Sequence, residues 1–180
     1  MLDIAGAVQR SFTFPAPRPA ARAYFEDFRH VLSLLPHIRL VRAHGAGQFR
    51  VLYHTVELGI YEIRLYCDLQ ARFDPQRHSL IVTPLRGIPP VKPRVTLTSL
   101  TAQGEYRSTS VFHSAGDATQ VDYHLRLNAR LPKPLGLNLL ADQTVERMAH
   151  RIVMGRIHEI ADGFIERSLA DYRKQHRRRP

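Results

Sequence analysis

The sequence predicts one α+β domain, in which a long C-terminal helix packs against a curved antiparallel sheet. Apolar and polar residues alternate over several segments between positions 38 and 131, which is typical of strands with one covered face. From position 138 to 174 the apolar residues instead recur at helical spacing. With 180 residues and 44% hydrophobic content, the chain is long enough to bury a substantial core.

A strand and two short helices precede the main sheet. Val8–Phe14 alternates and predicts the first strand, which a run of spaced prolines ends. Ala20–Phe28 has its aromatic residues at helical spacing, and a second helical piece, Val31–Leu35, stops at Pro36. Proline ends it because it lacks the backbone donor and restricts the residue before it.

Seven segments complete or accompany the predicted sheet. Ile60–Phe73 alternates most clearly, with an apolar face opposite a charged one, so we expect one face to be covered and the other to be wet. The expected strands after the two helices are Ile38–His44, Gln48–Glu57, Ile60–Phe73, His78–Thr83, an edge strand Val95–Leu100, Glu105–Ser114 and Val121–Leu131. The loop Pro84–Pro93 contains four prolines and fits two interpretations, a lid over a pocket or a plain surface crossing.

One helix is expected over Asn138–Lys174, and at 1.5 Å per residue it would be roughly 50 Å long. Gly155 and Gly163 lie inside it and indicate either a close backbone approach or a kink. We expect residues 1–176 to form the domain and residues 177–180 to form a basic tail.

The formal charge of +10 raises the expectation of anionic partners. Arginines supply most of it and are scattered along the chain, and the strands mix both signs, so the pattern favours contact with an acidic membrane over nucleic acid. The single cysteine excludes an internal disulfide, and no apolar run reaches the ~20 residues of a membrane span. Since Met1–Arg10 does not resemble a secretory signal, cytoplasmic residence is the simplest interpretation.

The sequence contains no motif for metal or nucleophilic chemistry. His158-Glu159 lacks the second histidine of a zinc helix, and His150 lies ~12 Å from His158 along the helix, so we expect no metal and no cofactor. Cys67 falls on an apolar strand face, where a cysteine acts as a small hydrophobe. The better candidate is an apolar face with a few polar groups, as small-molecule pockets have. Its predicted ligand-binding residues are Tyr61, Cys67, Tyr123, Leu125, Leu127, Met148, Ile152 and Ile157.

The order of elements, a strand, two short helices, further antiparallel strands and one long helix, resembles the START-like superfamily. This helix-grip group includes birch-pollen-allergen-like proteins, polyketide cyclases and coenzyme Q-binding proteins. The resemblance covers Val8 to Tyr172, and the segment Leu169–Lys174 is similar to the ending of an uncharacterised branch known from photosynthetic organisms. It implies a cavity between sheet and helix that holds a lipid, isoprenoid or polyketide. A filled core with no cavity is the alternative.

Three functions remain open at this point. The first is a carrier or sensor of a hydrophobic small molecule. The second is a cyclase- or hydratase-type enzyme that uses Tyr61, Tyr123 or His113 as acid and base in the same cavity. The third is a nucleic-acid or protein interaction module that uses the basic surface, including Arg177 to Arg179. The superfamily shares no catalytic motif, so we favour binding over catalysis.

Overall fold

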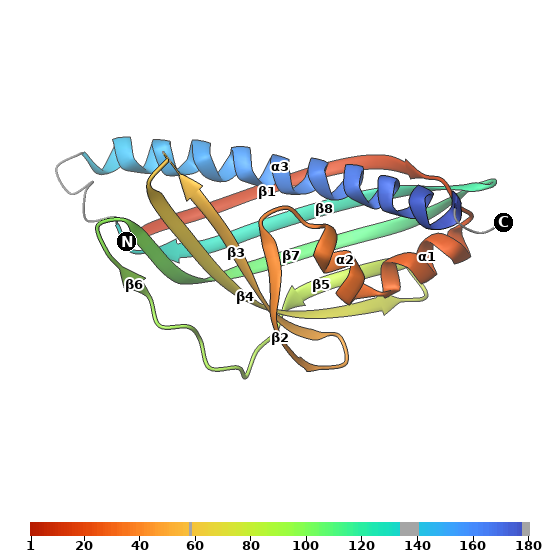
Figure 1. The fold of residues 1–180 in the computed structure, drawn as a ribbon, viewed down its shortest axis with the longest axis horizontal. Helices are drawn as coiled ribbons and strands as arrows, with labels where there is room; N and C mark the ends of the chain where they lie inside the picture. The colour runs from red at the N-terminus through yellow and green to blue at the C-terminus, as the bar shows by residue number, and fades with distance from the viewer. Residues whose placement is uncertain (58, 134–140, 178–180) are drawn as a thin grey trace.

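The computed structural model describes residues 1–57, 59–133 and 141–177. Within these described residues, three helices accompany eight strands (Figure 1). The helices are α1 (Arg18–Glu26), α2 (Phe28–Leu34) and α3 (Asp142–Arg177). The strands are β1 (Leu2–Phe14), β2 (Ile38–Gly45), β3 (Gln48–Glu57), β4 (Tyr61–Asp74), β5 (Ser79–Pro84), β6 (Arg94–Val95), β7 (Ser99–Ala115) and β8 (Ala118–Leu131).

The strands form one sheet in the order β1-β8-β7-β5-β4-β3-β2, and β6 pairs with β7. These neighbours are antiparallel, but β4 also pairs with β7 in parallel, from Glu62 opposite Ser99 to Tyr66 opposite Gln103. The sheet is curved, and α3 runs along one face of it while α1 and α2 sit at one end (Figure 1). The predicted α+β helix-grip architecture is therefore confirmed.

Close contact between β1 and α3 depends on a glycine. Residues of β1 alternate between buried and exposed, and Gly6 takes one of the buried positions. A Cβ atom added to Gly6 would clash with Cδ1 of Ile157, closer than real atoms approach. A larger residue at position 6 would therefore force the side chain of Ile157 to shift, so glycine suits this contact between strand and helix.

The two halves of α3 differ in how they pack. Among the described side chains of α3 before Ile157, only Val145 is buried, whereas the rest of the helix buries Ile157, Ile160, Ala161, Phe164, Ser168 and Tyr172. An aromatic cluster surrounds this second half: the ring centroid of Phe14 lies 4.6 Å from that of Tyr172 and 5.0 Å from that of Phe25. The C-terminal half of α3 is thus an integral part of the filled core.

The glycines of α3 have different surroundings. A Cβ on Gly163 would lie 2.6 Å from Cγ of Pro36, so this glycine permits a close approach to the loop after α2. A Cβ on Gly155 would meet no atom within 4 Å. Of the two interpretations offered for these glycines, close approach holds at Gly163 and has no support at Gly155.

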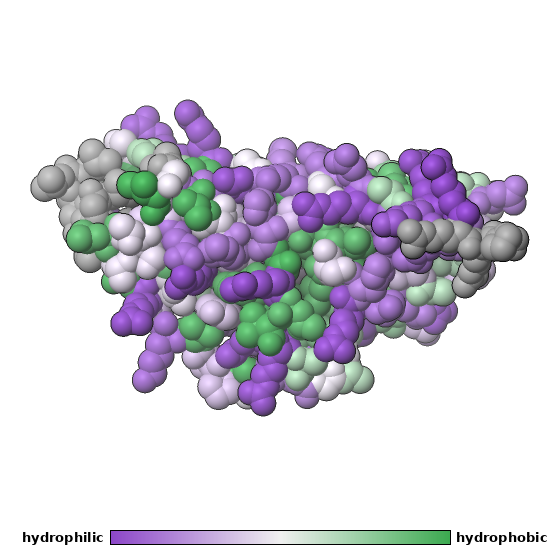
Figure 2. Space-filling view, viewed as in Figure 1, coloured by the Kyte–Doolittle hydropathy of each residue, from purple (hydrophilic) through white to green (hydrophobic). Residues whose placement is uncertain are grey.

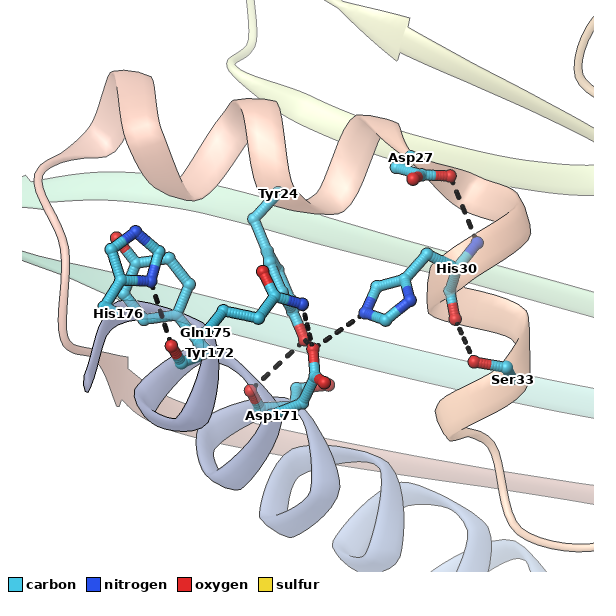
Figure 3. A network of polar contacts seen from close by, with 9 residues as sticks. Tyr24, Asp27, His30, Ser33, Asp171, Tyr172, Gln175 and His176 are labelled. Atoms are coloured by element: carbon cyan, nitrogen blue, oxygen red, sulfur yellow. Dashed lines mark hydrogen bonds and ion pairs between the residues drawn. The ribbon is translucent and has the colours of Figure 1, made fainter. Parts of the chain in front are cut away.

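A polar network also fixes the C-terminal half of α3 to the two short helices (Figure 3). Oδ2 of Asp171 accepts hydrogen bonds from the Tyr24 hydroxyl at 2.8 Å and from Nε2 of Gln175 at 2.8 Å, and it pairs with Nε2 of His30 at 2.7 Å. Burial raises the pKa of Asp171, but the hydrogen bonds from His30 and Tyr24 outweigh it and hold that pKa below its usual value.

Several predicted boundaries were wrong. The expected strand Val95–Leu100 is instead divided between two strands: Val95 ends β6, Ser99 and Leu100 begin β7, and the connection between them is closed by a hydrogen bond from Thr96 N to Ser99 O at 2.8 Å. β7 starts at Ser99 and not at Glu105, and β1 starts at Leu2 and not at Val8. The expected helix start, 138–140, lies outside the described residues, as do 178–180 of the expected tail. Among the described residues, α3 continues to Arg177, one residue past the expected end of the domain. The division of the chain at residue 176 stays a prediction.

Candidate functional site

A cavity of about 260 Å³ lies between the sheet and the N-terminal half of α3. The strands β1, β8, β7, β4 and β3 contribute to its wall. Every second residue of a strand points to the same face of the sheet, so each strand can supply several wall residues. The helix adds residues that recur every three or four positions. Aliphatic residues of the wall include Leu2, Ile4, Ile63, Leu100, Leu127 and Leu131 from strands, and Val145, Met148, Ile152 and Ile157 from α3.

Five of the eight predicted ligand-binding residues line this cavity: Tyr61, Leu127, Met148, Ile152 and Ile157. The other three, Cys67, Tyr123 and Leu125, are buried but are not part of the cavity wall. As contacts to a ligand, all eight stay predictions.

The three residues outside the wall belong to the filled part of the core. The Tyr123 hydroxyl lies 3.2 Å from that of Tyr106, and the Tyr123 ring centroid lies 5.2 Å from that of Phe164. Cys67 faces Gly104, where an added Cβ would lie 3.3 Å from its sulfur. Burial raises the pKa of the Cys67 thiol to about 12, so it stays protonated and is a poor nucleophile at neutral pH.

The structure also shows polar residues in the wall that were not predicted: Tyr53, Glu57 and Arg156. Arg156 forms a two-pronged ion pair with Glu57, from Nε to Oε1 at 2.8 Å and from Nη2 to Oε2 at 3.2 Å. Its Nη1 donates to Glu159, which also pairs with His37 at 2.7 Å. The hydrogen bonds from His37 and Arg156 lower the pKa of Glu159, so it is ionised at neutral pH.

One sequence signal could have indicated part of this polar wall. Tyr53, Thr55 and Glu57 occupy every second position of β3 and so share its inner face, and all three are buried. The Thr55 hydroxyl donates to Glu57 at 3.1 Å. A carboxylate on the covered face of a strand needs a partner, and that partner, Arg156, comes from α3.

Two tyrosine hydroxyls of the wall, those of Tyr53 and Tyr61, are buried and form no hydrogen bond with any described residue. Burial raises the pKa of Tyr53 to about 12 and also raises the pKa of Tyr61. Both phenols are therefore neutral at physiological pH and can donate a hydrogen bond.

The acid–base set expected of an enzyme does not come together. Tyr61 lines the cavity, while Tyr123 is held by Tyr106 in the filled core. His113 is exposed on β7 and pairs with Asp122 of β8 at 3.0 Å. Within residues 1–57, 59–133 and 141–177 no group of three or more histidine, cysteine or acidic side chains is arranged to hold a metal ion.

The proline loop contacts outward residues of the sheet, on the face opposite the cavity, and none of residues 84–93 belongs to the cavity wall. Asp68 follows the inward Cys67 in β4, so its side chain lies on the opposite face of the sheet, where it forms an ion pair with Arg50 at 2.7 Å. Arg50 also donates to the carbonyl of Pro89 at 2.7 Å, and Gln103 accepts from the backbone N–H of Val91 at 3.1 Å. These contacts fit the surface crossing and not the lid.

Comparison with known proteins shows a shared fold and little shared sequence. No protein-family model and no curated protein sequence matches the chain. The aromatase/cyclase Zhui from Streptomyces sp. R1128 superposes with a TM-score of 0.59 and 13% identity, over 97% of each chain. The di-domain aromatase/cyclase StfQ of the steffimycin biosynthetic pathway gives a TM-score of 0.54 and 12% identity, over 96% of this chain and 52% of that chain. The chain thus has the helix-grip fold of the START-like and polyketide cyclase-like proteins.

Proposed function

We propose that this chain binds an apolar small molecule in the cavity between its sheet and the N-terminal half of α3. The observation that carries the proposal is the cavity itself, about 260 Å³ with a wall whose surface is mainly apolar. An engineered apolar cavity of ~150 Å³ is large enough to hold benzene. The space here therefore suits a larger ligand, such as part of a lipid, isoprenoid or polyketide.

The arrangement of α3 supports binding over a purely structural role. Its C-terminal half is fixed by the aromatic cluster and by the Asp171 network, while its N-terminal half covers the cavity. Protein interiors are normally packed without voids of this size, so an unfilled apolar space beneath one half of a helix is unusual for a core.

Native mass spectrometry of the purified protein, followed by organic extraction, tests the proposal. We expect an added mass that extracts as an apolar compound, or uptake of one from a panel of lipids and isoprenoids. Ala149→Trp would fill the cavity from α3 and abolish uptake, whereas Ala170→Trp, on an exposed part of the same helix, would not. A protein that carries no ligand and takes up none from the panel would contradict the proposal.

We also propose that the cavity end of the molecule contacts acidic membranes. Ile60 and Leu97 belong to the cavity wall and yet are each 75% exposed. Apolar side chains gather at the end of the molecule that carries the β3–β4 and β6–β7 turns (Figure 2). The contact that we propose is peripheral. No helix within the described residues is long and apolar enough to span a bilayer.

Vesicle co-sedimentation tests this contact. We expect binding to vesicles with phosphatidylserine, weaker binding to phosphatidylcholine alone, and loss of binding in Ile60→Ser/Leu97→Ser. Equal binding of the variant and the unaltered protein would contradict a role for these two side chains.

Catalysis of the cyclase or hydratase kind is the weaker alternative for the same cavity. The aromatase/cyclases Zhui and StfQ share the fold, but Tyr61, Tyr123 and His113 of this chain do not converge. Nucleic-acid binding has less support still, because many arginines pair with carboxylates on the protein itself. These pairs include Arg10–Asp162, Arg22–Glu26, Arg50–Asp68, Arg64–Glu62 and Arg130–Asp3.

A further inference from the structure

The polar part of the cavity wall carries information about the ligand. Tyr53 is more than nine-tenths buried, and its hydroxyl has no hydrogen-bond partner among the described residues. Tyr61, on the neighbouring strand, is only partly buried as a residue, but its hydroxyl is also buried and has no hydrogen-bond partner among the described residues. Buried hydroxyls without a partner are costly, and native proteins normally satisfy them with protein, water or ligand.

The two tyrosines are part of the cavity wall on one side of it. Residues 53, 55 and 57 of β3 share a face, and register places Glu57 opposite Tyr61 and Tyr53 opposite Leu65. Both tyrosines therefore belong to the same hairpin wall, on which the other residues include the aliphatic Ile63 and Leu65.

The charged residues of this wall leave no surplus positive charge. Glu57 and Arg156 are the charged residues that line the cavity within the described part of the chain. The Arg156 guanidinium gives Nε and Nη2 to Glu57 and Nη1 to Glu159, so one cation lies between two carboxylates. Even with His37 protonated, these groups together carry no net positive charge. An anionic ligand group would lack a free cation to pair with, and burying it unpaired is unfavourable.

We infer that the cavity selects an apolar ligand with one neutral oxygen group, a carbonyl or hydroxyl, that accepts a hydrogen bond from Tyr53 or Tyr61, and that it discriminates against carboxylates. This inference rests on the proposed binding function and specifies the ligand class for that same cavity. Neutral ketones, esters, quinones and alcohols belong to this class, while ionised fatty acids do not.

Three probes of nearly equal size test the inference: acetylnaphthalene, ethylnaphthalene and naphthoate. Their affinities are measured by fluorescence or calorimetric titration of the full chain. One net hydrogen bond is expected to make acetylnaphthalene bind roughly 5-fold more tightly than ethylnaphthalene. The unpaired charge of naphthoate is expected to weaken its binding by at least about tenfold relative to acetylnaphthalene.

Tyrosine variants show whether the hydroxyls cause this selectivity. In Tyr53→Phe/Tyr61→Phe, we expect the preference for acetylnaphthalene to fall to about onefold, with the affinity for ethylnaphthalene unchanged. Tyr66→Phe is the matched control, since Tyr66 alternates with Leu65 and is not part of the cavity wall. Thermal unfolding checks that the variants fold, and removal of unpartnered hydroxyls is not expected to lower stability.

The outcomes separate this inference from the function on which it rests. Binding of ethylnaphthalene with no preference for acetylnaphthalene, or tightest binding of naphthoate, would overturn the ligand class and leave the apolar binding function standing. A preference that survives in the double variant would overturn the role of the two tyrosines. If no probe binds to the unaltered protein, the binding function fails, and the inference with it.

Discussion

Two glycines of the same helix are expected to respond to alanine with opposite signs. In a helix interior alanine is about 1 kcal/mol more favourable than glycine. At Gly155 the added methyl group meets no atom within 4 Å, so Gly155→Ala should gain that full amount. At this chain length the gain corresponds to a rise in Tm of roughly 2–4 °C.

At Gly163 the same gain is opposed by a clash. The added Cβ would lie 2.6 Å from Cγ of Pro36 and 3.6 Å from its Cδ. Both atoms belong to a pyrrolidine ring, which cannot rotate away as a flexible side chain can. Overpacking of this kind costs about 1–3 kcal/mol, so Gly163→Ala should lower the free energy of unfolding by up to about 2 kcal/mol.

Urea unfolding followed by circular dichroism measures both variants, and a double-mutant cycle isolates the clash. Pro36→Ala removes the ring, so the cost of Gly163→Ala should disappear in that background, with a coupling of at least about 1 kcal/mol. If Gly163→Ala stabilises the protein as much as Gly155→Ala does, the close approach of α3 to Pro36 is refuted.

Three further predictions concern the other contacts of α3. Gly6→Ala should cost about 1–3 kcal/mol by overpacking against Cδ1 of Ile157, and Ile157→Val should relieve most of that cost in thermal unfolding of the double variant. Asp171→Ala should cost about 1–3 kcal/mol because three donors lose their acceptor. Since the pKa of Asp171 in the folded protein lies below its ordinary 3.8, its contribution to the free energy of unfolding is present above that pH and is lost on further acidification. An acid unfolding profile that is the same in Asp171→Ala and the unaltered protein would contradict this. Arg156→Met should cost about 3–5 kcal/mol in urea unfolding because it leaves the buried Glu57 carboxylate without a cationic partner, and Arg156→Met/Glu57→Leu should recover much of the loss.

Alternation predicted the strands whose two faces differ in polarity. The bounds of β3 were predicted correctly at both ends, and both predicted bounds of β4 lie one residue too early. β7 was predicted too short because the inward positions of the missed part include Ala102 and Gly104, which do not contrast with outward polar residues. A small residue suits a buried position where strands and helix lie close, but sequence alone does not reveal that closeness.

The candidate site was predicted in part for a related reason. Alternation assigns a residue to a face of the sheet but not to a place along it. Tyr123 and Tyr61 share the covered face, yet the aromatic side chain of Phe164 fills the space over Tyr123, while the thinly packed half of α3 lies over Tyr61. The ion pair between Glu57 and Arg156 joins residues 99 positions apart, a distance over which sequence pattern carries no pairing information.

The pairing of β1 with β8 has a consequence for synthesis of the protein on the ribosome. β1 lies at one edge of the sheet, and its partner strand is β8, with Leu2 opposite Leu131 and Phe14 opposite Thr119. More than a hundred residues must therefore be translated before the first strand can form its ladder. At ~5–20 residues per second this interval lasts roughly 5–25 s, during which the apolar residues of β1 remain uncovered and depend on chaperones or on the nascent helices for protection.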